Sequence, residues 1–106
     1  MQQAFQVAST PIYKAEKPVR NPLYTRWVKR FPCVACGGTR DIDPMHTGGH
    51  GLGQKASDMK CLPGCRKCHV QFDADPRGFA AQHNLNIPAL IESFNQRWEL
   101  KQRRTA

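Results

Sequence analysis

Large apolar residues recur at helical spacing near both ends of the chain and are sparse between them. Toward the C-terminus, gaps of three and four residues between apolar positions predict a helix over residues 88–101. These positions are Leu90, Ile91, Phe94 and Trp98, and Leu100 can extend them. We expect this stripe to pack on the core rather than to bind a partner.

A second apolar face follows Asn21 near the N-terminus. Asn21 and Pro22 are typical of a helix start, because an asparagine side chain caps free amides and proline has no amide hydrogen. Leu23 and Trp27 then mark one face of the predicted helix, which Pro32 ends. We expect Trp27 to lie in the core.

The stretch before this helix has a different character. It shows no hydrophobic period and contains Pro11 and Pro18. We therefore predict an extended basic arm over residues 1–20, followed by one domain over residues 21–106. A chain of 106 residues is long enough for only one small core.

The middle of the chain predicts two short strands separated by a loop. Residues 39–45 and 58–63 are the candidate strands. The glycine-rich stretch 47–57 between them predicts no regular element. It is either a plain surface loop or one whose amides, together with Lys55, approach a phosphate.

A helix is expected after the second strand, from about residue 66 to Phe72. Val70 and Phe72 are expected to face the core. His69 and Asp73 are four residues apart, so they would share one face of this helix.

Four of the five cysteines form two Cys-x-x-Cys pairs, Cys33 with Cys36 and Cys65 with Cys68. Two residues between the thiols let both sulfurs reach one ion, and structural zinc takes four ligands in a closed tetrahedron. The pairs therefore predict a structural zinc site, which would stabilise a segment poor in large apolar residues. Cys61 remains as a free thiol, which we expect to be partly buried.

The chain carries a net charge of +8, from 16 Lys and Arg against 8 Asp and Glu. This excess predicts a polyanionic partner. Nucleic acid is the foremost choice, because neutralising phosphates supplies most of the non-specific affinity for DNA. The candidate contacts are Arg26, Lys29, Arg30, Lys55 and Arg66.

The first residues lack the basic and apolar pattern of a signal peptide, and no stretch is long and apolar enough to cross a membrane. These features predict a cytoplasmic protein, in which paired cysteines bind metals rather than form disulfides. No feature of the sequence predicts an oligomeric state.

The segment DIDPMHTGGHGLGQKASDMKCLPGCRKCH places a histidine after a strand, then a glycine-rich loop, Lys-x-x-Asp and Cys-x-x-Cys-His. That order resembles the HNH endonucleases, also called His-Me finger or ββα-metal nucleases. It is most similar to a phage and prophage subgroup that includes the recombination-enhancement nuclease. The similarity covers about residues 31–73.

The resemblance implies a small α+β fold: a zinc-stapled core of two strands and a helix around one catalytic ion, with flanking helices and the arm. His46 would be the general base, oriented by Asp58. His69 and Asp73 would bind the catalytic ion, which would be Mg²⁺ or Mn²⁺, with Zn²⁺ as an alternative. Phosphodiester hydrolysis needs such a base to deprotonate water and a cation on the developing charge.

Met45 departs from the family pattern, in which many members carry a metal-binding Asp or His directly before the catalytic histidine. Asp43, Asp41 or water could supply that ligand instead. His50 could be a ligand or the base.

The resemblance thus predicts a metal-dependent endonuclease, of phage origin and acting in a bacterial host, that cleaves DNA with low sequence specificity. Whether that DNA is duplex, single-stranded or branched stays open. One alternative is a non-catalytic zinc module that binds nucleic acid and needs neither His46 nor Asp58. Another is a thiol redox protein, which a tightly held zinc with unreactive thiols would exclude.

Overall fold

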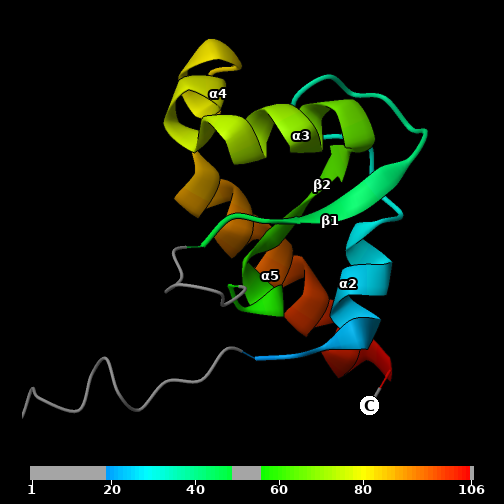
Figure 1. Cartoon of the computed structure of the whole chain (residues 1–106). Coiled ribbons are helices and arrows are strands. Elements are labelled where there is room, and N and C mark those ends of the chain that lie inside the picture. Colours follow the sequence, from blue (N-terminus) through cyan, green and yellow to red (C-terminus); the bar gives the residue numbers. More distant parts are fainter. Residues whose placement is uncertain (1–18, 49–55, 106) are drawn as a thin grey trace, which may run out of the picture.

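The computed structural model describes residues 19–48 and 56–105. Most of the predicted arm, His50 and Lys55 lie outside these residues. The described elements are α2 (Pro22–Val28), β1 (Ile42–His46), η2 (Asp58–Lys60), β2 (Cys61–Cys65), α3 (Arg66–Ala74), α4 (Pro76–Gln82) and α5 (Ile87–Thr105). Helices combined with one two-stranded sheet confirm the predicted α+β class. In Figure 1, α3 lies above the two strands, α5 below them and α2 beside them.

Strands β1 and β2 form an antiparallel pair in which Ile42 is paired with Cys65 and His46 with Cys61. Both strands begin later than predicted, at residues 42 and 61. The pairing joins the strand that carries His46 to the strand that ends at the second cysteine motif.

The second predicted strand was wrong over its first three residues, which form the 3-10 helix η2. Ser57 explains this difference. Its side chain accepts the Met59 amide hydrogen at 3.2 Å, and its carbonyl accepts that of Lys60 at 3.0 Å. A serine that bonds the backbone locally favours a turn over a strand.

Helix α2 begins where the sequence predicts. The Asn21 side chain accepts the Tyr24 amide hydrogen at 3.1 Å, and Pro22 stands in the first turn. The helix ends at Val28, before Pro32 is reached. Its short length makes its position depend on packing rather than on helix propensity.

An aromatic cluster joins α2 to α5. Trp27 is 9% exposed, and its ring centroid lies 4.9 Å from that of Phe31, 5.9 Å from Phe94 and 5.3 Å from Trp98. Tyr24, which is fully buried, meets Trp98 edge to face at 5.4 Å. The core position of Trp27 and of the α5 stripe is confirmed.

Two apolar residues expected near the core are exposed instead. Val70 is 65% exposed and Leu100 is 53% exposed, so these predictions were wrong. In each helix the residue two positions away packs inward, Phe72 on α3 and Trp98 on α5. Two residues correspond to about 200° around a helix, so such neighbours lie on opposite sides.

The last helices extend further than predicted. Helix α3 runs to Ala74, and α4 follows directly because Asp75 caps it by accepting the Gly78 amide hydrogen at 3.1 Å. Helix α5 continues to Thr105. None of the helices in the described part of the chain is long and apolar enough to span a membrane.

Candidate functional site

The four cysteines of the two pairs come together between the loop after α2 and the start of α3. Their sulfurs all lie within 4.8 Å of one another, and Cys36 Sγ is 3.8 Å from Cys65 Sγ. A tetrahedral ion with four sulfur ligands at about 2.3 Å places those sulfurs about 3.8 Å apart. The cluster can therefore hold a metal ion such as zinc. It is the one such group of three or more ligands among residues 19–48 and 56–105.

Backbone amides of the first pair point at its sulfurs. Ala35 donates to Cys33 Sγ and Gly38 donates to Cys36 Sγ, each at 3.4 Å. Gly37 adopts a φ of 76°, a left-handed backbone conformation that residues with a side chain rarely adopt, and it lets the chain turn back on itself. Burial raises the pKa of the Cys33 thiol, but hydrogen bonds from the surrounding backbone outweigh it and lower the pKa to about 6. A thiol with that pKa is largely the thiolate that binds metals.

Cys61 takes no part in this cluster. It is fully buried, more so than expected, at the position of β2 opposite His46. Burial raises the pKa of its thiol to about 12. Cys61 is therefore a protonated core residue rather than a ligand.

His46 at the end of β1 meets Asp58 at the start of η2. Nε2 of His46 lies 2.8 Å from Oδ1 of Asp58. Asp58 is 8% exposed and is the one buried charged residue in the described ranges, whereas the His46 side chain keeps 22% of its surface. A buried carboxylate thus holds one nitrogen of a ring that still reaches solvent.

Asp58 is itself held from the N-terminal side of α2. The Asn21 amide donates to its Oδ2 at 2.7 Å, and Arg20 donates to its Oδ1 at 3.4 Å and to the Ala56 carbonyl at 2.9 Å. Burial raises the pKa of the Asp58 carboxyl, but the hydrogen bonds from His46 and Asn21 and the nearby positive charge outweigh it. The pKa therefore lies below its usual value, and Asp58 is ionised at neutral pH.

A second group of side chains surrounds His69 on α3. Its Nδ1 lies 3.0 Å from Oδ2 of Asp43, and its Nε2 lies 3.4 Å from Oδ2 of Asp73. Arg66 adds a bond to Oδ1 of Asp43 at 3.2 Å. The hydrogen bond from His69, with further help from Arg66, lowers the pKa of the Asp43 carboxyl. His69 and Asp73 share a face of α3 as predicted.

Asp43 was one of three choices for the ligand missing at Met45, and the structure places it beside His69. Asp41 instead accepts the Arg66 amide hydrogen through its carbonyl at 3.0 Å. Met45 is fully buried and packs against Gly64. The residue directly before His46 therefore belongs to the core.

The two histidine groups are separate. Asp43 and His46 are three residues apart on β1, and burial along this strand does not alternate, because Ile42 and Met45, also three residues apart, are both buried. Among the described residues, His46 and Asp58 form no hydrogen bond or ion pair with Asp43, His69 or Asp73. The structure thus shows two adjoining clusters on one strand pair and helix, and their membership of one catalytic site stays a prediction.

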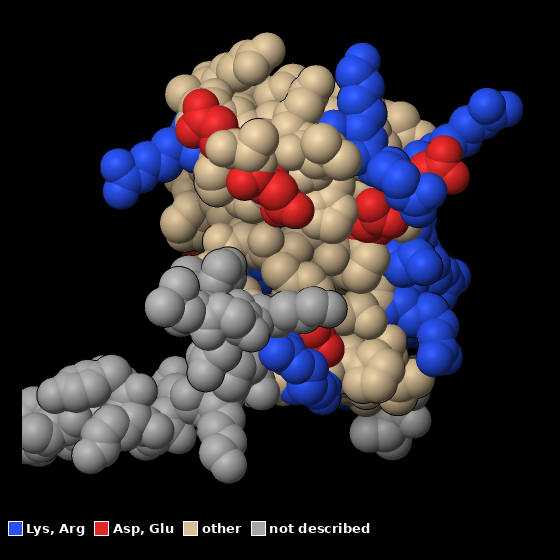
Figure 2. Space-filling model, in the orientation of Figure 1, with Lys and Arg blue, Asp and Glu red and all other residues tan. Residues whose placement is uncertain are grey.

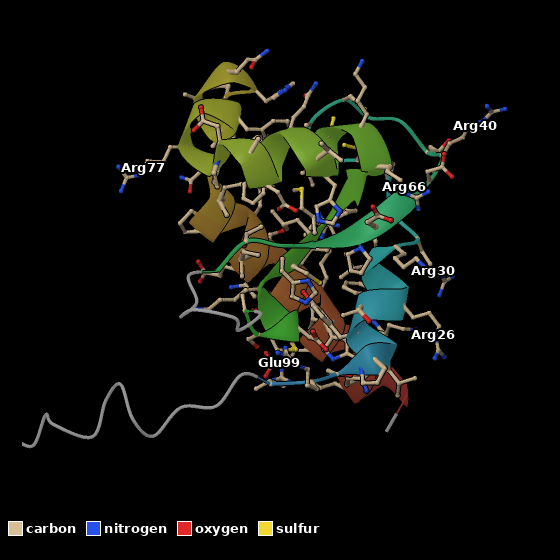
Figure 3. The ribbon with its side chains drawn as sticks, in the orientation of Figure 1. Arg26, Arg30, Arg40, Arg66, Arg77 and Glu99 are labelled. Carbon is tan, nitrogen blue, oxygen red and sulfur yellow. The ribbon has the colours of Figure 1, made fainter. Side chains whose placement is uncertain are left out.

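The predicted basic contacts that lie within the described residues are exposed, and three of them lie along one edge. Arg26, Lys29, Arg30 and Arg66 are all exposed. Figure 3 shows Arg66, Arg30 and Arg26 in succession along one edge, with Arg77 projecting from the opposite edge. Figure 2 shows Lys and Arg side chains concentrated on that same side.

Asn95 was not found from the sequence, although it connects three parts of the fold. From α5 it donates to the Tyr24 hydroxyl at 2.8 Å and to the Met59 carbonyl at 3.0 Å. It therefore fixes α5 against α2 and against the residue that follows Asp58. A polar residue next to Phe94 was the only signal, and it does not reveal partners so distant in sequence.

Comparison with known proteins places the chain in a family. An uncharacterized protein of Escherichia coli (strain K12), YdfU, is 49% identical over 76 residues, which cover 69% of this chain and 22% of that protein. The chain thus spans about a fifth of the length of this curated relative. No solved structure gives a significant match. The family model described as a protein of unknown function, DUF968, matches residues 12–100, so the chain belongs to the DUF968 family.

Proposed function

We propose that this protein is a metal-dependent HNH endonuclease that hydrolyses DNA phosphodiester bonds with low sequence specificity. The observation that carries the proposal is the 2.8 Å contact between His46 Nε2 and the buried carboxylate of Asp58. An ionised carboxylate at Nε2 keeps the ring proton on that nitrogen and leaves the lone pair on Nδ1. Nδ1 would then accept the proton of the attacking water.

The order of the elements supports this assignment. The antiparallel pair β1–β2 is followed directly by α3, so the chain has the strand, strand and helix that the HNH resemblance implies. His46 lies on the first strand and His69 on the helix. The cysteine cluster connects the start of this helix to the segment before β1, so a bound zinc would fix the two histidine-bearing elements relative to each other.

His69 and its carboxylates fit a divalent ion. Because Asp43 bonds Nδ1 of His69, the remaining nitrogen Nε2 faces Asp73, and these two groups would hold the ion. Asp43 would then orient the imidazole, as carboxylates commonly do for metal-binding histidines. A mixed imidazole and carboxylate set suits Mn²⁺ or Mg²⁺. The ion would stabilise the negative charge that develops on the phosphate and the leaving oxygen.

The charge of the protein supports DNA as the proposed substrate. The net charge of +8 and the exposed residues Arg26, Lys29, Arg30 and Arg66 suit a phosphate backbone, which carries no sequence information by itself. The further proposal of phage or prophage DNA processing in the bacterial cytoplasm rests on the resemblance alone.

A plasmid assay tests the proposal. Zinc-loaded protein is incubated with supercoiled plasmid and Mg²⁺ or Mn²⁺, beside the variants His46→Ala and Asp58→Asn. We expect relaxed or linear plasmid with the wild type only. His83→Gln, at the end of α4, is the matched histidine control and should cleave like the wild type. If the wild type leaves the plasmid intact in every divalent ion, the nuclease proposal is wrong and the non-catalytic zinc module is the better account.

A further inference from the structure

One hollow lies between α2 and α5 and a second lies on α5 alone, and we call them together the α2–α5 groove. One hollow, of about 220 Å³, is bordered by Leu23, Trp27 and Trp98 and by basic side chains of both helices. The other, of about 340 Å³, lies over Leu100 near the end of α5. Lys101 lines both, so the two hollows are neighbours.

The groove is strongly cationic. Five basic residues line it, and no acidic residue does among the described ones: Arg26, Arg30, Arg97, Lys101 and Arg104. The three on α5 are separated by four and three residues, so they lie on one side of that helix. The acidic residues Glu92 and Glu99 line a different hollow on α5. That hollow shares Trp98 and Gln102 with the groove, but the glutamates themselves do not line the groove.

The aromatic rings beneath the groove are already packed against one another. Trp27 is 9% exposed and is enclosed by Phe31, Phe94 and Trp98, so it cannot stack on a nucleic-acid base. The guanidinium of Arg97 lies 4.9 Å from the centre of the Phe94 ring, which holds this charge at the surface. The groove thus offers fixed positive charge without a platform for bases.

We propose that the α2–α5 groove binds the phosphate backbone of nucleic acid as a second contact surface, separate from the His46–Asp58 pair. The basic side chains that line the groove, four of them arginines, complement a row of phosphates and would repel a second copy of the same face. Helix α2 connects the groove to the pair, because the amide of Asn21 at its start bonds Asp58, whereas Arg26 and Arg30 lie further along. This inference rests on the proposed function for the choice of DNA as the polyanion.

Salt-dependent binding tests the groove without requiring cleavage. A fluorescein-labelled oligonucleotide, as duplex and as single strand, is titrated with zinc-loaded His46→Ala protein from about 50 to 200 mM NaCl, with no other divalent ion. Arg26→Gln and Arg104→Gln are each added to this background. Arg77→Gln, on the opposite edge in Figure 3, is the matched control for removal of one charge.

Each groove variant should weaken binding by on the order of tenfold at 0.1 M salt. Each should also reduce the slope of log K against log salt by about 0.9 for duplex or about 0.7 for single-stranded DNA. The form of DNA that shows this change is the natural ligand. Unchanged slopes in the groove variants, or an equal loss with Arg77→Gln, would overturn the proposal. So would binding to phosphatidylserine vesicles without binding to either oligonucleotide.

The plasmid assay and the binding assay fail independently. If the groove variants lose binding but the wild type does not cleave plasmid, the proposal for the groove stands and the proposal of a nuclease is rejected. If the wild type cleaves plasmid but the groove variants bind DNA as well as their parent does, the proposal for the groove is rejected and the proposal of a nuclease stands.

Discussion

The backbone amide of Asn21 donates a hydrogen bond to Oδ2 of Asp58 at 2.7 Å, while His46 occupies Oδ1 of the same carboxylate. One buried side chain therefore connects the start of α2 to the end of β1. Asn21 also caps α2 through its own side chain. The residue proposed to orient the catalytic histidine is thus also part of the packing of the fold, and its roles in folding and in chemistry have to be separated by experiment.

Asp58→Asn separates the two roles. The amide keeps the size of the carboxylate and can still accept the Asn21 amide hydrogen, but its NH₂ group would donate to His46 Nε2. His46 would then carry its proton on Nδ1 and could not act as the base through that atom. We expect plasmid cleavage to fall by two or more orders of magnitude, in line with general-base catalysis of about 10²–10⁴-fold. The free energy of unfolding should fall by only about 1–3 kcal/mol.

Circular dichroism and urea unfolding of zinc-loaded Asp58→Asn check that the fold is retained. Asp75→Asn, which alters the exposed cap of α4, is the matched control for the amide change and should cleave normally. If Asp58→Asn cleaves as fast as the wild type, the orienting role of Asp58 is wrong.

The same substitution makes a prediction about pH. The pKa of Asp58 is lower in the folded protein than its value of about 3.9 in the unfolded chain. Its contribution to stability is therefore fully present above the unfolded pKa and is lost as pH falls through the folded pKa. The difference in unfolding free energy between wild type and Asp58→Asn should be constant near neutral pH and shrink below about pH 4.

Urea unfolding at a series of pH values measures this difference. Acid also releases zinc from thiolates, but that effect is common to both proteins and cancels in the difference. A difference that grows as the pH falls would mean that the Asp58 carboxyl is not stabilised in its charged form.

Metal content distinguishes the cysteines from one another. Cys65→Ala should abolish the binding of one zinc per chain and the cooperative unfolding transition, because binding to such sites supplies on the order of 10 kcal/mol to folding. Cys61→Ala should keep the zinc, because this buried thiol, with a pKa of about 12, is not a ligand. Metal analysis by mass spectrometry reads out both. Zinc retained in Cys65→Ala, or lost only in Cys61→Ala, would contradict the four-cysteine site.

Asp43→Asn tests the assignment of the second cluster. Without the carboxylate at Nδ1, His69 is less well oriented, so the Mn²⁺ concentration for half-maximal cleavage should rise about 10–100-fold. The rate at saturating Mn²⁺ should recover toward that of the wild type, which a residue essential to the chemical step would not allow. Glu92→Gln, on the far face of α5, is the control. If Asp43→Asn needs the same Mn²⁺ concentration as the wild type, the assignment of Asp43 to the metal site is wrong.

Sequence patterns predicted the features that depend on residues close together in the chain or on a recognisable ligand motif. The start of α2 follows from Asn21 and Pro22, and the spacing of the cysteines predicted a cluster that the structure brings together. The apolar stripe on α5 was located correctly up to Trp98. The helix start and the stripe depend on residues within one or two helical turns, where periodicity and capping are decisive. The cysteine cluster joins pairs 29 residues apart, and it was predicted because two Cys-x-x-Cys pairs together supply the four ligands of a metal site.

What the sequence could not predict depends on contacts between distant segments. The bond from Asn21 to Asp58 spans 37 residues and that from His69 to Asp43 spans 26. The side of β1 on which Asp43 lies follows from the register with β2, which a single short polar strand does not specify. The assignment of His46 and His69 to one catalytic site stays a prediction.

The rate of plasmid nicking by wild type and by His46→Ala, at equal zinc content and saturating Mn²⁺, tests the central claim most directly. His46→Ala removes the proposed base but leaves the cysteine cluster, the His69 group and the basic groove in place. We expect its first-order rate constant to be at least about 10²-fold lower than that of the wild type. Equal rate constants for the two proteins, or no nicking by the wild type, would contradict the account.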